Sequence, residues 1–550
     1  MLRMPPVLNK PAQLGLRGVV EGYSLTQAWR AGMLGPERPS RTVAVFRALD
    51  RLGPIGGAIA IAGIKHADRI GLIDELGSLT FGELDARSDA LACALRARGA
   101  GEGDTVGILC RNHRGFVDIT FAVAKLGARA LYLNTEFAGP QLHDVCAREQ
   151  VALLVHDEEY EELVAPTRPR LGTLLGWTDD SNGDDTLETL IAAHAGQVAP
   201  APARRSSVVL LTSGTTGAPK GAPRHQGRSL APIGAILSKV PFKAREATHI
   251  AAPMFHALGF AETIVAIGLG STVIVERRFR PERALESVAR HRATALIVVP
   301  VMLQRIVNLL EAEPGGHDTS SLRIVLVAGA QLEAELARRS LRVLGDTIYN
   351  FYGSTEVAWA TFATPEDLRA APGCVGRAPF GTVVRLFDTE GRAIEGPGRT
   401  GRIFVGNGFA FEGYTGGGNK EQINGLMSTG DVGHFDAEGR LFVDGRDDDM
   451  IVSGGENLFA GEVEELLITH AAVEEAAVIG VDDADFGKRL AAFVVLRPGA
   501  TMSEDDVREF VKRNLARYKV PRDVIFIDEL PRNPTGKVLK RDLRAQYASG

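Results

Sequence analysis

The chain has 550 residues, of which 45% are hydrophobic and 24% charged, so it is long enough for several subdomains around a large core. A net charge of −6 excludes a general affinity for nucleic acids, and no apolar run approaches the ~18 residues of a membrane span. The beginning of the chain lacks a basic-then-apolar signal pattern. Four scattered cysteines without a CxxC spacing argue against a disulfide scaffold or a zinc site, and they favour the reducing cytoplasm.

Residues 1–52 form a basic extension, with eight Lys or Arg against three acidic residues and a net charge of +5. The stretch Ser40–Leu52 predicts a helix whose apolar residues share one face, namely Val45, Phe46, Leu49 and Leu52. Two interpretations stay open for this extension. The helix packs on the surface of the main domain, or it makes a peripheral contact with an anionic membrane.

From residue 70 the pattern alternates between strands and helices. Thr80 and Glu83 form a capping box that predicts a helix ending at Gly99. Apolar runs predict strands at Thr105–Leu109, Val208–Leu211, Thr272–Val275, Ala295–Val299 and Ile324–Val327, with helices at Glu282–His291 and Glu333–Leu344. This alternation indicates an α/β domain of layered, mainly parallel sheets and helices.

The sequence pattern changes at residues 445–450, which form a polar, charged stretch. The remaining residues predict helices at Gly461–His470 and Ser503–Tyr518 and strands at Val473–Val481, Leu490–Leu496 and Asp523–Ile527. We therefore expect a large domain over residues 53–447 and a small mobile α+β domain over residues 448–550.

The stretch Thr212–Gly221 follows the apolar run Val208–Leu211 and combines glycines, hydroxyl residues and one lysine. Such a loop offers backbone N–H groups, hydroxyls and an ammonium to a polyanion. It is not a Walker A loop, because Lys220 follows Pro219 and precedes Gly221. The phosphate contacts predicted here come from Thr212, Ser213, Gly214, Thr215, Thr216, Gly217 and Lys220.

A second motif, Tyr352-Gly353-Ser354-Thr355-Glu356, follows an extended stretch. A tyrosine after a strand usually packs in a core, and a loop glutamate is usually solvated. Together, however, the five residues supply an aromatic ring that can stack on adenine, a hydroxyl for the α-phosphate and a carboxylate for Mg²⁺.

These motifs, with their partners downstream in the same order, resemble the adenylate-forming superfamily of acyl-CoA synthetases, aryl-CoA ligases, luciferases and adenylation domains. The resemblance covers roughly residues 70–540. It implies that Gly329 and Ala330 line adenine with their backbone, and that Asp431 accepts hydrogen bonds from the ribose hydroxyls with Arg446 beside it.

The resemblance also assigns roles at the start and end of the small domain. Asp448 matches the hinge, and Gly454 and Gly455 match the hairpin that lines the tunnel for the pantetheine arm of CoA. Lys537, in Pro-Thr-Gly-Lys, matches the catalytic lysine that reaches the carboxylate and the α-phosphate. The catalytic set implied in this way is Thr216, Lys220, Glu356, Arg446 and Lys537, with Mg²⁺ on Glu356.

The segment Met254–Gly259 resembles the acyl-pocket motif of the family, with His256 either as a gate beside the pocket or as an ordinary core histidine. Relatives that activate amino acids generally have an aspartate at this position, so an amino-acid substrate is disfavoured. The residues predicted to line the acyl pocket are Phe255, His256, Phe260, Met302, Val357 and Trp359.

Two stretches depart from the family pattern: the residues after Gly221, and the loop Gly413–Lys420. Both departures leave the substrate less defined. By contrast, the runs Leu133–Phe137 and Gly373–Gly376 look most like bacterial fatty-acyl-CoA synthetases.

We therefore expect an enzyme that uses MgATP to convert a medium- or long-chain fatty acid to acyl-AMP and then transfers the acyl group to CoA. An aryl-CoA ligase, and a fatty-acyl-AMP ligase that delivers to a carrier protein, remain alternatives. A nucleotide-binding module without catalysis is disfavoured by the presence of both Lys537 and Glu356. The assembly state stays open, with a homodimer among the candidates.

Overall fold

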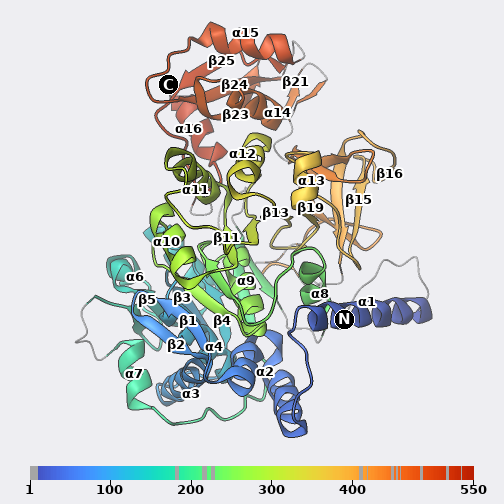
Figure 1. The fold of residues 1–550 in the computed structure, drawn as a ribbon. Helices are drawn as coiled ribbons and strands as arrows, with labels where there is room; N and C mark the ends of the chain where they lie inside the picture. Colours follow the sequence, from blue (N-terminus) through green and yellow to red (C-terminus); the bar gives the residue numbers. More distant parts are fainter. Residues whose placement is uncertain are drawn as a thin grey trace.

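The structure is a computed structural model that describes residues 10–179, 185–212, 220–224, 229–407, 413–415, 417, 419–447, 451–453, 456–458, 460–483, 487–515, 519–533 and 536–549. In Figure 1 the small C-terminal domain lies above α11 and α12 of the large domain, and an antiparallel sheet lies at one side. Within the described residues, no helix is long and apolar enough to cross a membrane. The four cysteines are free.

The first sheet has eight strands in the order β14-β13-β12-β11-β9-β10-β1-β2, parallel except for antiparallel pairs at its two edges. Its strands are short and largely apolar, because helices cover both faces of such a sheet. Their bounds are β1 Ile70–Asp74, β2 Gly77–Thr80, β9 Ala247–Ile250, β10 Thr272–Val275, β11 Ala295–Val298, β12 Ile324–Val327, β13 Ile348–Tyr352 and β14 Thr361–Ala363.

The second sheet has six strands in the order β6-β5-β3-β4-β7-β8, of which only β8 is antiparallel. Its bounds are β3 Thr105–Leu109, β4 Arg129–Tyr132, β5 Val151–Asp157, β6 Thr173–Trp177, β7 Ser207–Thr212 and β8 Lys220–Arg224. The predicted layers of mainly parallel sheets are thereby confirmed.

The third sheet is antiparallel and was not expected from the sequence. Its order is β16-β15-β17-β19-β18, with β20 paired to β19. Its bounds are β15 Val383–Phe387, β16 Ala393–Ile394, β17 Gly401–Gly406, β18 Gln422–Ile423, β19 Leu426–Phe435 and β20 Leu441–Arg446.

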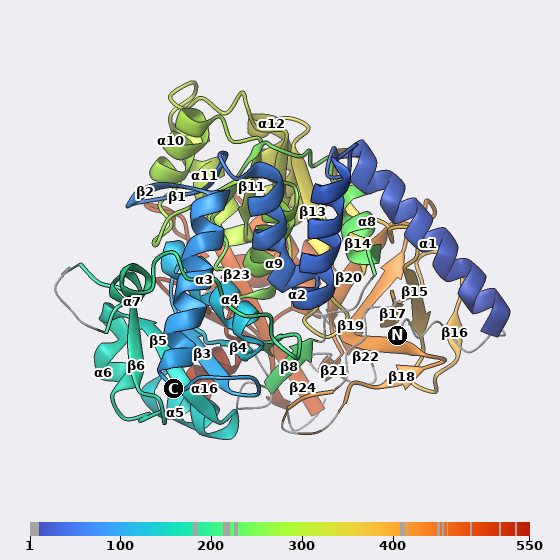
Figure 2. The same ribbon diagram turned by 90° about the horizontal axis from the view of Figure 1, so that it is seen from below.

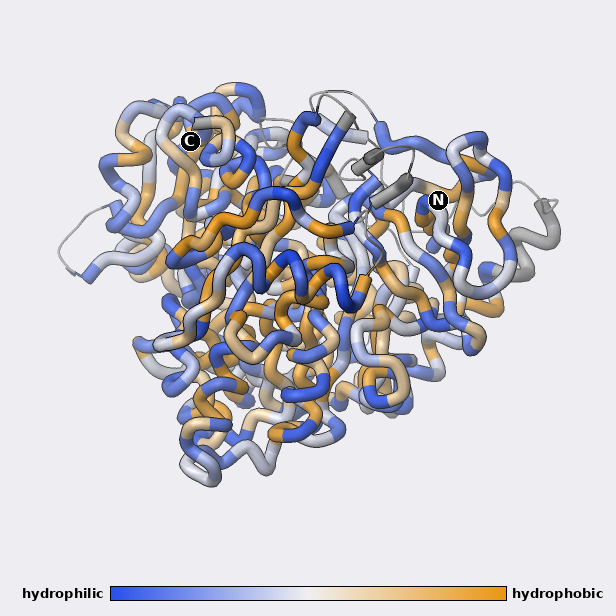
Figure 3. Tube along the Cα trace, turned by 90° about the horizontal axis from the view of Figure 1, so that it is seen from above, coloured by the Kyte–Doolittle hydropathy of each residue, from blue (hydrophilic) through white to orange (hydrophobic). Residues whose placement is uncertain are grey.

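Helices connect and cover these sheets. The capping box at Thr80 and Glu83 is present and opens α3, which ends at Ala97, close to the predicted end. The helices of the large domain after α2 are α3 Phe81–Ala97, α4 Arg114–Leu126, α5 Gly139–Arg148, α6 Glu161–Val164, α7 Leu187–Ala193, α8 Ala231–Leu237, α9 Ala257–Gly268, α10 Pro281–His291, α11 Pro300–Ala312, α12 Ala334–Leu344 and α13 Pro365–Ala370, with a short 3-10 helix at Glu158–Tyr160. The tube in Figure 3 shows apolar segments gathered in the interior.

The N-terminal region forms two helices, α1 Lys10–Arg30 and α2 Pro39–His66. Glu21 of α1 accepts hydrogen bonds from the Ser229 hydroxyl and the Leu230 backbone N–H at the start of α8. The predicted helix at Ser40–Leu52 is part of the longer α2, which kinks at Gly53 (φ 74°) and then packs against α3, α4 and α9. Figure 2, which views the molecule from below, shows α2 in front of the sheets and α1 at one side.

The small domain contains a hairpin of β21 Ile451–Ser453 and β22 Glu456–Leu458, and a sheet in the order β23-β24-β25. Its other elements are α14 Ala460–Ile468, β23 Val473–Asp483, β24 Gly487–Leu496, α15 Glu504–Asn514, β25 Asp523–Phe526 and α16 Lys540–Ser549. The capping box at Ser503 and Asp506 is present, but α15 ends at Asn514, earlier than predicted.

Candidate active site

One cavity of about 2200 Å³ lies where the carboxyl ends of β11, β12 and β13 meet the third sheet and the small domain. The carboxyl ends of parallel strands form the usual ligand-binding edge of an α/β sheet. Ligand pockets typically measure about 300–1,000 Å³, so this volume can hold more than one ligand. The cavity is mainly apolar towards α9 and α2 and polar near the small domain.

Three predicted nucleotide contacts form a bonded group in this cavity. The Tyr352 hydroxyl donates to Asp431 Oδ2 at 2.6 Å, and Arg446 Nη1 donates to Asp431 Oδ1 at 3.1 Å. Asp431 and Arg446 are paired residues on β19 and β20, and Tyr352 ends β13. Burial raises the pKa of Asp431, while Arg446 and the Tyr352 hydrogen bond lower it. Burial and Asp431 raise the pKa of the Tyr352 phenol.

The residues after Tyr352 form a compact loop. The Ala360 N–H donates to Tyr352 O at 2.9 Å, and Ala358 N–H donates to Ser354 O at 2.8 Å. A Cβ on Gly353 would overlap the backbone oxygen of Ala358, so only glycine fits at this position. Gly353, Ser354, Thr355 and Glu356 all line the cavity, as the sequence motif predicts.

Glu356 is buried, and its Oε1 accepts a hydrogen bond of 2.6 Å from the Tyr414 hydroxyl. Next to Tyr414, the Thr415 N–H donates to Gly221 O at 3.0 Å, which ties this loop to β8. Tyr414 was not among the predicted site residues, although the sequence signal was the Gly-Tyr pair that opens the divergent loop at Gly413.

Gly329 and Ala330, just beyond β12, also line the cavity. Gly329 has φ of 95°, a conformation that favours glycine, and this turn carries the backbone along the cavity wall. Gly329 and Ala330 thus lie where their backbone could make the predicted contact with adenine.

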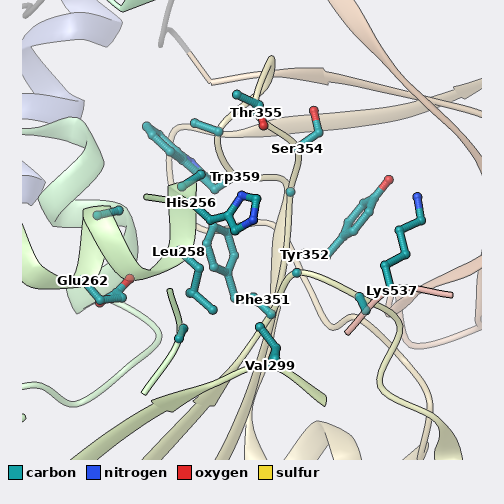
Figure 4. A pocket seen from close by; sticks show the side chains of 18 of the residues that line it. His256, Leu258, Glu262, Val299, Phe351, Tyr352, Ser354, Thr355, Trp359 and Lys537 are labelled. Atoms are coloured by element: carbon teal, nitrogen blue, oxygen red, sulfur yellow. The ribbon is translucent and has the colours of Figure 1, made fainter. Parts of the chain in front are cut away.

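Lys537 of the small domain lines the same cavity, more than 180 residues along the chain from Tyr352. Its neighbour Gly536 packs so closely on Val301 of α11 that a Cβ there would overlap the valine side chain. Gln331 Nε2 also donates to Glu465 Oε1 of α14 at 2.9 Å. These contacts hold the small domain over the cavity with Lys537 on the side of Tyr352 (Figure 4).

The part of the cavity near the start of α9 is lined by Phe255, His256, Phe260 and Trp359, four of the residues predicted for the acyl pocket. Phe260 packs on Tyr132 with ring centroids 4.9 Å apart, and the Trp359 indole donates to the Thr382 hydroxyl at 2.8 Å. Nε2 of His256 is buried without a hydrogen-bond partner, and burial lowers the pKa of His256 to about 4. His256 is therefore neutral at physiological pH.

Two residues predicted for the acyl pocket, Met302 and Val357, are not among the residues that line the cavity. Met302 lies on α11 and packs against core side chains. Val357 is buried in the core of the third sheet, since the turn around Ala358 points its side chain away from the cavity while Ala358 and Trp359 stay in the wall.

Several predicted residues lie outside the described residues: Ser213, Gly214, Thr215, Thr216, Gly217, Asp448, Gly454 and Gly455. Thr212 and Lys220 are described by their backbone, as paired residues at the ends of β7 and β8. The roles given to these positions by the sequence remain predictions.

A buried triad outside the cavity consists of Cys110, His113 and Asp157. His113 Nε2 lies 2.8 Å from Asp157 Oδ1, and His113 Nδ1 accepts from the Gly115 N–H at 3.1 Å. Both imidazole nitrogens are thus engaged within the protein. We interpret the triad as a structural hydrogen-bond network that fixes the start of α4.

The chain matches two profiles of known protein families. The profile described as AMP-binding enzyme matches residues 62–415, and the one described as AMP-binding enzyme C-terminal domain matches residues 462–537. The chain belongs to the AMP-binding enzyme family. It is a member of the adenylate-forming superfamily and an AMP-forming acid–CoA ligase that uses ATP.

Among its relatives, indoleacetate–CoA ligase of Aromatoleum aromaticum is 32% identical over 86% of this chain and 93% of its own length. Feruloyl-CoA synthase of an Amycolatopsis species is 34% identical over 86% and 94%. The fatty acid–[acyl-carrier-protein] ligase ScoC of Streptomyces coeruleorubidus is 30% identical over 86% and 92%. The solved structure of ATP-bound MatB from Rhodopseudomonas palustris is 28% identical, with a TM-score of 0.80 over 90% of this chain and 99% of that protein.

In this family member, the sequence analysis missed one buried acid of the cavity wall. Glu262 of α9 lines the cavity and is only 2% exposed. The available signal was a lone acidic residue in the otherwise apolar helix Ala257–Gly268.

Proposed function

We propose that this ligase activates fatty acids with a long apolar tail and transfers them to CoA. The observation that carries this proposal is the continuation of the cavity beyond His256 and Phe260, between α9 and α2. Its apolar lining residues there are Ala261, Ile264 and Val265 of α9 and Val45, Leu49, Ala58 and Ile61 of α2, followed by Leu34. A compact acid would fill the inner part, whereas an alkyl tail would bury additional area along this wall.

We further propose that the polar half of the cavity holds ATP. Asp431, positioned by Tyr352 and Arg446, would accept hydrogen bonds from the ribose hydroxyls. The Tyr352 ring and the backbone at Gly329 and Ala330 would border the adenine. The loop between β7 and β8 would bind the phosphates through its N–H groups and hydroxyls.

The residues near Glu356 fit a magnesium ion. Glu356 is a buried carboxylate that lines the cavity, as does its sequence neighbour Thr355, and Mg²⁺ in phosphate sites takes oxygen ligands with one or two protein carboxylates. When bound, the ion would neutralise phosphate charge. Tyr414 would orient the carboxylate through its hydrogen bond to Oε1.

In the first half-reaction, a carboxylate oxygen of the acid attacks the α-phosphorus, and pyrophosphate leaves. Lys537 would stabilise the negative charge on the attacking carboxylate and the α-phosphate. In the second half-reaction, the CoA thiol attacks the acyl carbon and AMP leaves. A rotation of the small domain about Asp448 would admit the thiol along the β21–β22 hairpin.

An aromatic acid is the second candidate substrate. The names of the indoleacetate and feruloyl relatives favour it, and so do the rings of Phe255, Phe351 and Trp359 around the inner cavity. A ring would pack well against these side chains. An aromatic acid would, however, make no contact with the apolar wall between α9 and α2.

The test compares rates of AMP formation with CoA for hexanoate, decanoate, palmitate, indoleacetate and ferulate. We expect palmitate and decanoate to give the highest kcat/KM. Val265→Trp should narrow the outer channel and lower kcat/KM for palmitate by at least about tenfold, with little effect on hexanoate. Val265→Leu is the matched control. Preference for an aromatic acid, or equal loss for palmitate and hexanoate in the tryptophan variant, would overturn the proposal.

A further inference from the structure

Among the described residues of the acyl wall, His256 and Glu262 each have a buried polar atom without a hydrogen-bond partner, and Glu262 is the one further along α9. Glu262 lies on α9 among Leu258, Ala261 and Val265, all of which line the cavity. Its Oε2 is buried and has no hydrogen-bond partner. A buried polar group without a partner costs stability. An ordinary core position on this helix would be occupied by an apolar side chain.

The surroundings of Glu262 determine its charge state. Burial raises the pKa of Glu262 to about 8, and no charged neighbour contributes to the shift. The carboxyl group is therefore mainly neutral at pH 7, with one O–H donor and one carbonyl acceptor. A neutral carboxyl favours a neutral hydrogen-bonding partner over a cation.

The position of Glu262 sets where such a partner would lie. Glu262 lies six positions after His256, the N-cap of α9, which corresponds to about 9 Å along the helix axis. In Figure 4, Glu262 and Lys537 lie on opposite sides of the pocket, with His256 and Tyr352 between them. The reacting carboxylate belongs near Lys537, so Glu262 faces the tail of the acid.

From this geometry we infer that the enzyme selects fatty acids that carry a hydroxyl or carbonyl oxygen along the tail, which pairs with Glu262. This inference rests on the proposed fatty-acid function and names the substrate class more closely. A hydroxyl can donate to and accept from the Glu262 carboxyl, whereas an unsubstituted tail would cover the carboxyl and leave it unpaired.

The test uses decanoate and its positional hydroxydecanoates, oxodecanoates and aminodecanoates as substrates for the full-length enzyme, assayed by AMP release with CoA. For at least one positional isomer, we expect the wild-type kcat/KM to exceed that for decanoate by about tenfold to a hundredfold. Glu262→Leu should reverse the preference, raising kcat/KM for decanoate and lowering it for that isomer. Glu262→Gln keeps a donor and an acceptor and should retain most of the preference.

The outcomes separate the two proposals. If decanoate is activated at least as well as every oxygenated isomer, or if Glu262→Leu changes both classes by the same factor, the inference is overturned while the fatty-acid function stands. If a tail ammonium is preferred over a hydroxyl and Glu262→Gln abolishes that preference, the inferred class is also overturned. If only aromatic acids are activated, both proposals fail. Both variants should fold, because replacing an unpaired buried acid does not remove a hydrogen bond.

Discussion

The phenol of Tyr352 donates a 2.6 Å hydrogen bond to Asp431, which joins the end of β13 to the middle of β19. Removing it in Tyr352→Phe keeps the ring but frees one carboxylate oxygen. We expect the KM for ATP to rise by about tenfold, with a smaller change in kcat. Tyr349→Phe, on the same strand but outside the described cavity lining, is the control.

This pair also predicts a pH dependence. Burial raises the pKa of Asp431 and the Tyr352 hydrogen bond lowers it, so the phenylalanine variant should have a still higher pKa at Asp431. The ionised carboxylate is the better acceptor for ribose hydroxyls, so ATP binding weakens as pH falls through this pKa. The acidic limb of kcat/KM for ATP should shift to higher pH in Tyr352→Phe. An unchanged limb would show that Asp431 does not control it.

Lys537 should act in only one half-reaction. Lys537→Ala should lower the rate of acyl-adenylate formation by about 10²–10³, the usual cost of one preorganised charge. Thioester formation from synthetic acyl-adenylate and CoA should stay within a few-fold of wild type. Lys512→Ala, at an exposed α15 position paired with Glu509, is the control. Equal slowing of both half-reactions would contradict the proposed domain alternation.

Gly353→Ala should damage the loop between Tyr352 and Ala360. The new Cβ would meet the Ala358 backbone oxygen, whose peptide group is held by the hydrogen bond from the Trp359 N–H to Val357 O. We expect a stability loss of about 1–3 kcal/mol and a marked loss of adenylation, measured by thermal unfolding and pyrophosphate release. Gly101→Ala is the control, because nothing lies within 4 Å of its added Cβ. Wild-type activity in Gly353→Ala would show that the loop is not part of the site.

The N-terminal helices allow a direct test of membrane contact. Trp29 and Phe46 are 66% and 65% exposed, in a region with a net charge of +5. We expect the protein to sediment with anionic vesicles, less so in high salt and less so in the double variant Trp29→Ser/Phe46→Ser. Val198→Ser, at another exposed apolar residue, is the control. Absence of sedimentation for the wild type would leave a purely structural role for these helices.

Glu262 should make stability depend on pH. Its pKa rises from 4.5 to about 8 in the folded protein, so between these values folding requires the acid to take up a proton. The uptake is unfavourable and its cost grows with pH, reaching on the order of 3 kcal/mol at pH 7. Glu262→Gln avoids this cost and should unfold at a higher temperature than wild type at pH 7. The gap should narrow towards pH 4.5, and a constant gap would contradict the raised pKa.

Sequence patterns predicted the order of strands and helices because hydrophobic runs and capping boxes are local signals, as at Thr80 and Ser503. The family motifs also predicted that Tyr352, Asp431 and Lys537 would line one cavity, although they are far apart in the chain. They could not predict that the Tyr414 hydroxyl would reach Glu356, since this bond depends on how a loop of the third sheet folds over the first.

Side-chain direction was the weakest point of the sequence interpretation. Val357 and Trp359 are two residues apart and were both predicted to line the pocket, yet only Trp359 lines the cavity, because Ala358 adopts φ of 63° and the backbone turns there. Met302 was predicted to line the pocket but packs against core side chains, because an apolar residue can occupy a cavity wall or a core equally well. Glu262 was missed because an isolated glutamate usually indicates a solvated surface.

The contact between Gly536 and Val301 has a consequence for the timing of the catalytic cycle. The missing side chain at Gly536 lets the segment that carries Lys537 seat directly against α11. Any rotation that withdraws Lys537 must also open this glycine–valine contact and admit water to it. Withdrawal of Lys537 and exposure of the Gly536–Val301 contact to water are therefore a single event. A spectroscopic probe at position 301 would consequently report, in each turnover, when the enzyme leaves its adenylating state.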